Sequence, residues 1–215
     1  MKTRTKALLL AMCAVLLVVT TVMATLAFLT STTKVVKNTF TVGNVKITLD
    51  EADVDNSTAD KDRDTENEYH LLPNKEYDKD PTVHVQAKSE NCYIFVTVTN
   101  DIVNIEKAGN TTIAAQMAAN GWTPIADGSN TFYYNGTANG VVNGVVEKNS
   151  AVQDFVVFKT FTIMGEVDND TLATYVTNDA KTTNLITVVG YAVQAQGFNS
   201  AVEAWNATFG APQNP

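Results

Sequence analysis

The sequence has few of the residues that build redox and catalytic sites. Its 215 residues include only two cysteines and two histidines. Cys13 lies inside an N-terminal apolar run, so removal of that run leaves Cys92 as the single thiol and excludes an internal disulfide. We therefore expect a domain held together by its core, with Cys92 as a small buried residue; a redox or intermolecular role for this thiol is the alternative.

Positive charge is also scarce. The chain has 15 Lys and Arg residues against 23 Asp and Glu residues, for a formal net charge of -8. This balance argues against a nucleic-acid partner and against electrostatic docking on anionic lipid, since both need clustered Lys and Arg. Hydrophobic residues make up 45% of the chain, which argues against wholesale disorder and favours one main folded domain.

Recognisable catalytic motifs are missing. His70 and His84 are 14 positions apart, and neither belongs to an H-E-x-x-H pattern. The sequence contains no G-x-S-x-G elbow, no P-loop and no dinucleotide-binding fingerprint. We therefore predict a protein that is not an enzyme and uses no cofactor. A zinc site that joins the two histidines to loop carboxylates is the alternative.

The N-terminus has the pattern of an export signal. A basic start, formed by Lys2, Arg4 and Lys6, precedes an uncharged apolar run over residues 7–29. This order is typical of a secretory signal peptide, which we place at residues 1–27. The run is also long enough to cross a bilayer, so an uncleaved membrane anchor is the alternative.

Small residues near the end of the run suit a signal peptidase. We predict cleavage between Ala27 and Phe28, with cleavage after Ala24 as the second choice. Loss of three basic residues leaves 12 Lys and Arg against 23 Asp and Glu, so the mature charge is 12 - 23 = -11. The expected location is secreted, in the extracellular matrix or on the cell surface.

The mature chain has mainly strand patterns. Alternating or β-branched apolar segments occur at residues 38–51, 83–86, 92–100, 132–134, 155–163 and 185–195. Turn-rich loops separate them without a βαβ rhythm, which predicts an all-β, antiparallel β-sandwich over residues 38–210 and a loose tail at 211–215. Gly43 stands where the alternation in the first segment changes parity, which indicates a β-bulge.

Two of the expected strands have both faces apolar. In residues 92–100, Ile94, Val96 and Val98 share one face while Tyr93 and Phe95 lie on the other, so we expect cover on both sides near the start of the strand. The continuous apolar character of residues 185–195 predicts burial on both faces as well.

Short helices interrupt the strands. Residues 111–120 are alanine-rich, with Thr111 as the expected N-cap and Gly121 just beyond the end. Ser200 and Glu203 have the spacing of a capping box, which predicts a final helix with an apolar stripe formed by Val202, Trp205 and Phe209. A helical turn is also expected around residues 172–176.

Two ligand-binding patterns are present in weak form. Asp60, Asp62 and Asp64 alternate as in the first half of a calcium loop, but Thr65 and Leu71 replace the turn glycine and the bidentate glutamate. A charged surface loop without metal is the preferred interpretation. Four aromatic residues could form a carbohydrate platform, although core packing is the preferred role for most of them: Trp122, Tyr133, Tyr134 and Trp205.

The leader ends in ATLAFLTS and is followed by the pattern N-x-F-x-x-G-x-V-x-I-x-L, which is formed by Asn38, Phe40, Gly43, Val45, Ile47 and Leu49. In this pattern the chain resembles the TasA/camelysin family of secreted Gram-positive proteins. Residues 80–100 and 188–205 are similar to segments of clostridial proteins with the same type of leader. This resemblance implies a jelly-roll-like sandwich, processing by a SipW-type signal peptidase, and assembly into biofilm-matrix or cell-surface fibres.

A donor strand is available for such assembly. After cleavage, residues 28–37 read FLTSTTKVVK, a β-prone segment without Pro or Gly in which Phe28, Leu29, Val35 and Val36 could fill pockets of the next subunit. A flexible leader, or the first strand of its own domain, is the alternative. The expected partners are further copies of the chain, the signal peptidase, and accessory matrix or cell-wall proteins.

Two other functions remain open at this point. One is a monomeric surface module that binds glycans or proteins. The other is a metallopeptidase, because camelysin itself has been classed as one.

Overall fold

The computed structural model describes residue 12 and residues 41–42, 44–56, 63–138, 140–175 and 186–210. The chain divides into two compact units, Met1–Asn38 and Thr39–Pro215, and all elements below belong to the second. The predicted signal peptide, the cleavage pair Ala27 and Phe28, the donor segment 28–37 and the tail lie outside the described residues, Met12 excepted. Among the described residues, no helix has the length and apolar character needed to cross a membrane.

The described chain is mostly β-structure in antiparallel sheets. The largest sheet has seven strands: β1 (Thr41–Val42), β13 (Ile186–Gln194), β6 (Cys92–Asn100), β10 (Val145–Val146), β9 (Val141–Val142), β8 (Thr131–Tyr134) and β7 (Trp122–Pro124). In its centre, β13 pairs antiparallel with β6 over nine residues, from Ile186 opposite Asn100 to Gln194 opposite Cys92. The other edge of β6 pairs with β8 and β10, while β1 pairs parallel with β13.

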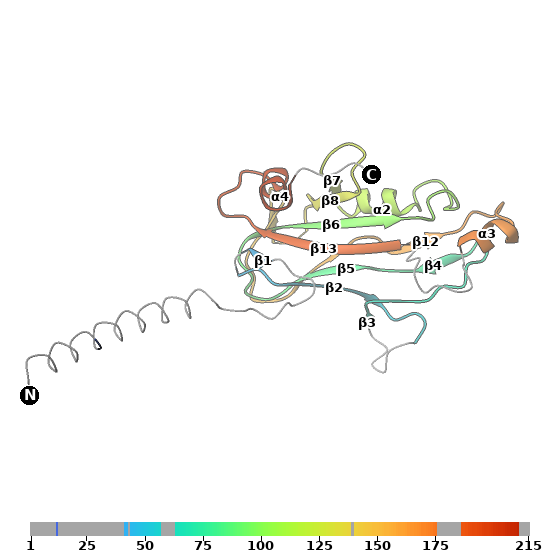
Figure 1. Cartoon of the computed structure of the whole chain (residues 1–215), viewed down its shortest axis with the longest axis horizontal. Coiled ribbons are helices and arrows are strands. Elements are labelled where there is room, and N and C mark those ends of the chain that lie inside the picture. The colour runs from blue at the N-terminus through green and yellow to red at the C-terminus, as the bar shows by residue number, and fades with distance from the viewer. Residues whose placement is uncertain are drawn as a thin grey trace, which may run out of the picture. The chain divides into compact units, whose positions relative to one another are not determined.

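A second sheet faces the first. Its four strands are β11 (Gln153–Val156), β5 (Thr82–Val85), β2 (Ile47–Ala52) and β3 (Arg63–Asp64). A two-stranded sheet is formed by β4 (Glu76–Asp78), which precedes β5 in the chain, and β12 (Thr160–Thr162), which follows β11. Figure 1 shows β6 and β13 running above β5 and β2, so the two main sheets form two layers.

The main core lies between these layers. Ile94, Val96 and Val98 of β6 pack in it together with Val83 and Val85 of β5. Alternation along each strand sends every second side chain inward, which explains why these residues are buried while His84 between them faces out.

A second, smaller core covers the outer face of the large sheet. Helix α4 (Ala201–Phe209) packs Ala204 and Trp205 against Tyr93 and Phe95 of β6. The two-sided cover predicted near the start of this strand is therefore confirmed for residues 92–96, and its physical basis is a sheet on one face and a helix on the other (Figure 1). Cys92 is fully buried, which confirms its predicted place in the core.

The prediction of one bulged strand over residues 38–51 is wrong. β1 belongs to the large sheet and β2 to the facing sheet, so the chain crosses between layers after Val42. The parity change near Gly43 marks this crossover. A bulge and a crossover both reverse the alternation, so local sequence could not separate them.

The expected strand over residues 155–163 is also divided. β11 pairs with β5, and β12 pairs with β4, and the residues between the two ladders belong to neither. Two backbone hydrogen bonds join these intervening residues, from Val157 N to Pro81 O at 2.8 Å and from Lys79 N to Lys159 O at 2.9 Å. Pro81 has no N–H to continue the ladder, which favours the interruption there.

The three described helices of the domain lie where the sequence predicted helical segments, but their bounds and caps differ in detail from the prediction. α2 spans Ile113–Ala119, and its N-cap is Thr112, one residue later than predicted. α3 spans Asn169–Tyr175. At α4 the Ser200 hydroxyl accepts from Glu203 N, as predicted, while the Glu203 carboxylate accepts from Asn199 N one residue before the N-cap.

Candidate functional site

One edge of β13 is largely open in the part of the chain that the structure describes. All nine residues of β13 pair with β6 on one side. On the other side, only Ala192 and Val193 have a described strand partner, the two residues of β1. Residues 186–191 therefore present backbone N–H and C=O groups to no described strand, which is the arrangement that invites pairing with an added strand.

The open stretch is apolar. Ile186 and Val188 are only half-buried against the main core, and Val189 on the opposite face is 38% exposed. The prediction that this strand is buried on both faces is confirmed for Ala192 and Val193 but wrong for Val189. The residues of β13 in the core formed with α4 are Tyr191 and Val193, so that cover does not include Val189.

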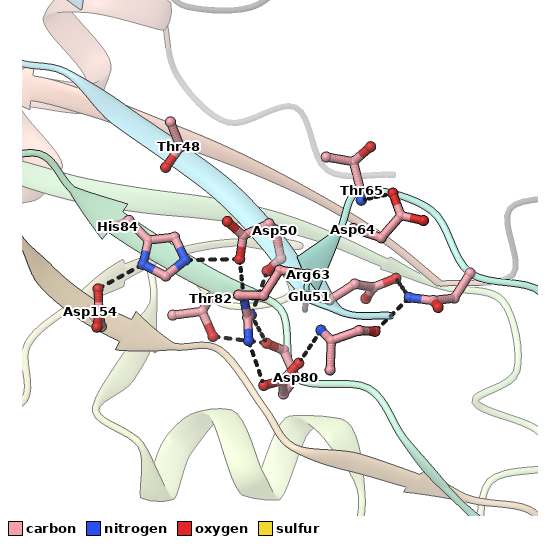
Figure 2. A network of polar contacts seen from close by, with 12 residues as sticks. Thr48, Asp50, Glu51, Arg63, Asp64, Thr65, Asp80, Thr82, His84 and Asp154 are labelled. Carbon is pink, nitrogen blue, oxygen red and sulfur yellow. Dashed lines mark hydrogen bonds and ion pairs between the residues drawn. The ribbon is translucent and has the colours of Figure 1, made fainter. Parts of the chain in front are cut away.

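A polar network crosses the outer face of the second sheet (Figure 2). His84 of β5 stands between two carboxylates from the neighbouring strands, with Nδ1 2.6 Å from Asp154 Oδ1 and Nε2 2.9 Å from Asp50 Oδ1. Arg63 of β3 binds the same Asp50 and donates from Nη1 to Asp80 Oδ2 at 3.1 Å. The network ties β11, β5, β2 and β3 together side by side.

The charges in this network reinforce one another. Burial disfavours the charged form of His84, but hydrogen bonds to Asp154 and Asp50 outweigh burial and raise the pKa of His84 above its ordinary 6.5. Burial also disfavours the charged carboxylate of Asp50, yet the hydrogen bonds from Arg63 and His84 hold its pKa below the ordinary 3.8. A protonated His84 donates to both carboxylates.

We expect His84 to make the stability of the domain pH-dependent. Because its pKa is raised in the folded state, His84 adds to the free energy of unfolding in full below pH 6.5, and this addition disappears as the pH rises through the pKa of the folded state. Asp50 has a lowered pKa, so it adds to the free energy of unfolding above pH 3.8, and its addition disappears as the pH falls through the pKa of the folded state. In urea unfolding at a series of pH values, the free energy of unfolding should therefore decline above pH 6.5, and this decline should be absent in His84→Gln.

The second histidine provides a matched control for this measurement. His70 is exposed and does not belong to the network, so His70→Gln should keep the decline of the unmodified chain. An equal flattening of the pH profile in both variants would contradict the assignment to His84.

The structure does not bring the two histidines into one group of metal ligands among the described residues. Both ring nitrogens of His84 already contact carboxylates. The zinc site considered from sequence therefore has no geometric support in the described part of the chain.

Three carboxylates do come together elsewhere. Asp53, Asp55 and Asp64 each offer an oxygen, and these atoms all lie within 4.8 Å of one another. Oxygen ligands of this kind suit hard cations such as Ca²⁺. Asp64 belongs to the alternating pattern noted in the sequence, whereas Asp60 and Asp62 lie outside the described residues.

A shallow groove lies at the end of β13 where α4 begins. It has a volume of about 440 Å³, and its lining combines three side-chain amides and two aromatic rings with one carboxylate and two aliphatic residues: Asn91, Gln194, Gln196, Tyr93, Phe198, Glu90, Val145 and Ala195. The aromatic residues considered from sequence as a carbohydrate platform lie elsewhere. Trp122, Tyr134 and Trp205 are buried in the two cores, and Tyr133 is half-buried, so the packing interpretation is confirmed for the first three.

Sequence analysis missed most of the polar network. Asp50, Arg63, Asp80 and Asp154 are spread over about a hundred positions, and only the strand pairing brings them together. The available signal was that Asp50 and His84 occupy outward positions of apolar strands. That signal does not identify the partner of either residue.

Comparison with protein-family models, with curated proteins and with solved structures finds no match. Function is therefore inferred from residues and geometry.

Proposed function

We propose that the chain is a secreted structural subunit of extracellular biofilm-matrix or cell-surface fibres. In this proposal, residues 28–37 of one copy add as a strand to the open edge of β13, at residues 186–191, in the next copy. The single observation that carries the proposal is the unequal pairing of β13, with nine partners on one side and two on the other among the described residues.

The lengths are compatible. Six residues of β13 span about 20 Å and a ten-residue strand spans about 33 Å, so the donor can cover the open stretch with residues to spare. Such a contact joins two different surfaces, and repetition of it produces an open filament instead of a closed dimer. Apolar donor residues Phe28, Leu29, Val35 and Val36 suit the half-buried Ile186 and Val188 at the acceptor edge.

Three further features belong to the same proposal. A SipW-type signal peptidase cuts between Ala27 and Phe28 and frees the donor segment. The two facing antiparallel sheets have a jelly-roll-like arrangement. Accessory matrix or cell-wall proteins anchor the fibre, and the subunit itself is not an enzyme.

Electron microscopy of the mature chain, beginning at Phe28, tests the proposal. We expect filaments from this chain and none after deletion of residues 28–37. Val189→Lys should also abolish filaments, because a charge at an open edge opposes strand addition. Val142→Lys is the matched control, since Val142 is 50% exposed on β9 of the same sheet, away from the proposed contact.

Filaments that persist in the deletion and in Val189→Lys would overturn the proposal. A strict monomer in all conditions, acidification included, would favour the alternative of a surface module for glycan or protein ligands. The groove at Asn91, Tyr93 and Phe198 supports that alternative, because amides and aromatic rings suit sugar recognition. Chelator-sensitive cleavage of casein would instead favour a camelysin-like metallopeptidase.

A further inference from the structure

Three side chains from separate segments meet at a buried carboxylate. Glu51 lies in β2, Asn67 follows β3, and Lys79 follows β4. One carboxylate oxygen of Glu51 accepts from Lys79 Nζ at 2.5 Å, and the other accepts from Asn67 Nδ2 at 2.9 Å. Glu51 is 5% exposed and Lys79 8% exposed. An amine and a primary amide are thus held on the two oxygens of one shielded carboxylate.

Aromatic rings lie against the Lys79 end of this arrangement, while Asn67 is half-buried. Lys79 Nζ lies 5.6 Å from the centre of the Tyr69 ring. Tyr69 in turn packs edge-on against Tyr77 and Phe161, with ring centroids 5.9 and 5.2 Å away. The Lys79 amine and the Glu51 carboxylate are therefore largely removed from solvent at the place where they meet.

The amide of Asn67 is fixed in orientation. Its Nδ2 donates to Ala52 O at 2.9 Å as well as to Glu51, and its Oδ1 accepts from Val54 N at 2.8 Å. A backbone N–H at the carbonyl oxygen is what stabilises an oxyanion during acyl transfer. The nitrogen that would leave is the one that contacts Glu51.

We propose that Lys79 and Asn67 become joined by an intramolecular amide bond, with Glu51 as the catalytic acid and base. Glu51 accepts a proton from the Lys79 ammonium, and the free amine attacks Asn67 Cγ. A bond forms between Nζ and Cγ while the carbonyl electron pair moves to Oδ1, where Val54 N–H stabilises it. The carbonyl then re-forms and the bond from Cγ to Nδ2 breaks.

The step balances without any further reagent. Nζ loses two protons in total, and Glu51 passes them to Nδ2, which leaves as an ammonium ion. Lys79 keeps one hydrogen on the new amide, and Glu51 ends as the carboxylate with which it began. No electrons are gained or lost, so no oxidant or reductant is involved.

Other lysine and asparagine pairs in the described chain lack part of this arrangement. Lys148 binds Glu90 beside Asn91, but the side chains of that ion pair are 51% and 39% exposed. Asn100 donates to the buried Glu106 at 3.2 Å, but no lysine among the described residues forms an ion pair with that carboxylate. The combination of burial, amine and oriented amide occurs at Lys79 and Asn67.

Intact-mass measurement of the purified, folded chain tests the proposal. We expect a mass below the sequence mass by one ammonia, and tandem mass spectrometry should find peptides joined through positions 67 and 79. Lys79→Arg keeps the ion pair without a nucleophilic amine, and Glu51→Gln removes the acid and base; both should have their full sequence masses. Asn67→Asp should lose water in place of ammonia.

Lys148→Arg is the matched control and should retain the loss of ammonia. A folded unmodified chain at its full sequence mass overturns the proposal, whatever the variants do. Persistence of the loss in Lys79→Arg also overturns it, because succinimide formation at an Asn-Gly pair such as Asn143 and Gly144 releases ammonia too. Circular dichroism confirms folding of each variant. The bond forms within one subunit, so neither result depends on whether filaments assemble.

Discussion

Replacing Phe95 with alanine is expected to lower the free energy of unfolding by about 3–5 kcal/mol, the usual cost of removing a large buried aromatic ring. Phe95 is fully buried on the outer face of β6, and its ring centroid lies 5.1 Å from that of Trp205 in α4. The variant opens a cavity between a central strand and the helix that covers it. Urea unfolding followed by circular dichroism measures the change.

Phe209→Ala provides the comparison. Phe209 also contacts Trp205, with centroids 4.5 Å apart, but it is half-buried at the last turn of α4. A smaller loss of unfolding free energy is expected there because less apolar surface leaves water on folding. Equal losses in the two variants would contradict the view that α4 is held mainly through its contact with β6.

The second large effect is expected at Lys79. Lys79→Met leaves the Glu51 carboxylate buried without a cation, and breaking a buried pair from one side costs about 3–5 kcal/mol. This figure applies to the ion pair of Lys79 with Glu51. In a chain with the proposed amide bond, the Lys79 nitrogen carries no charge, and Lys79→Met instead removes a covalent link between positions 67 and 79, which also lowers the free energy of unfolding. The change in unfolding free energy is measured in urea at neutral pH.

Two further variants separate the causes. Lys148→Met breaks the exposed pair with Glu90 and should cost at most about 1 kcal/mol. Glu51→Leu combined with Lys79→Met removes both charges and should recover part of the loss, because no buried charge remains. A cost for Lys79→Met no greater than that for Lys148→Met would contradict the buried character of the pair.

Several elements could be predicted because their signals are local. The capping residues of α4 lie within one turn, and the two faces of β6 follow from simple alternation. The hairpin between β9 and β10 is similar, since Asn143 and Gly144 adopt the positive φ values of 51° and 77° that a tight two-residue turn requires.

The candidate sites could be predicted less well. His84 and the alternation around it were visible, but its partners Asp50 and Asp154 come from strands whose neighbours no local pattern identifies. The same holds for Glu51, Asn67 and Lys79, which are ordinary charged or polar residues of loops and strand ends until the chain brings them together.

By itself the sequence determined the mainly β character, the positions of the short helices, the buried thiol and the inward face of each strong strand. These depend on side-chain alternation and capping within a few residues. Only the tertiary structure decided that β1 and β2 belong to two different sheets, that residues 186–191 of β13 pair on one edge only among the described strands, and that a lysine and an asparagine share one carboxylate. Those outcomes depend on pairing between distant segments, where burial and backbone hydrogen bonding of the whole domain select one partner among many.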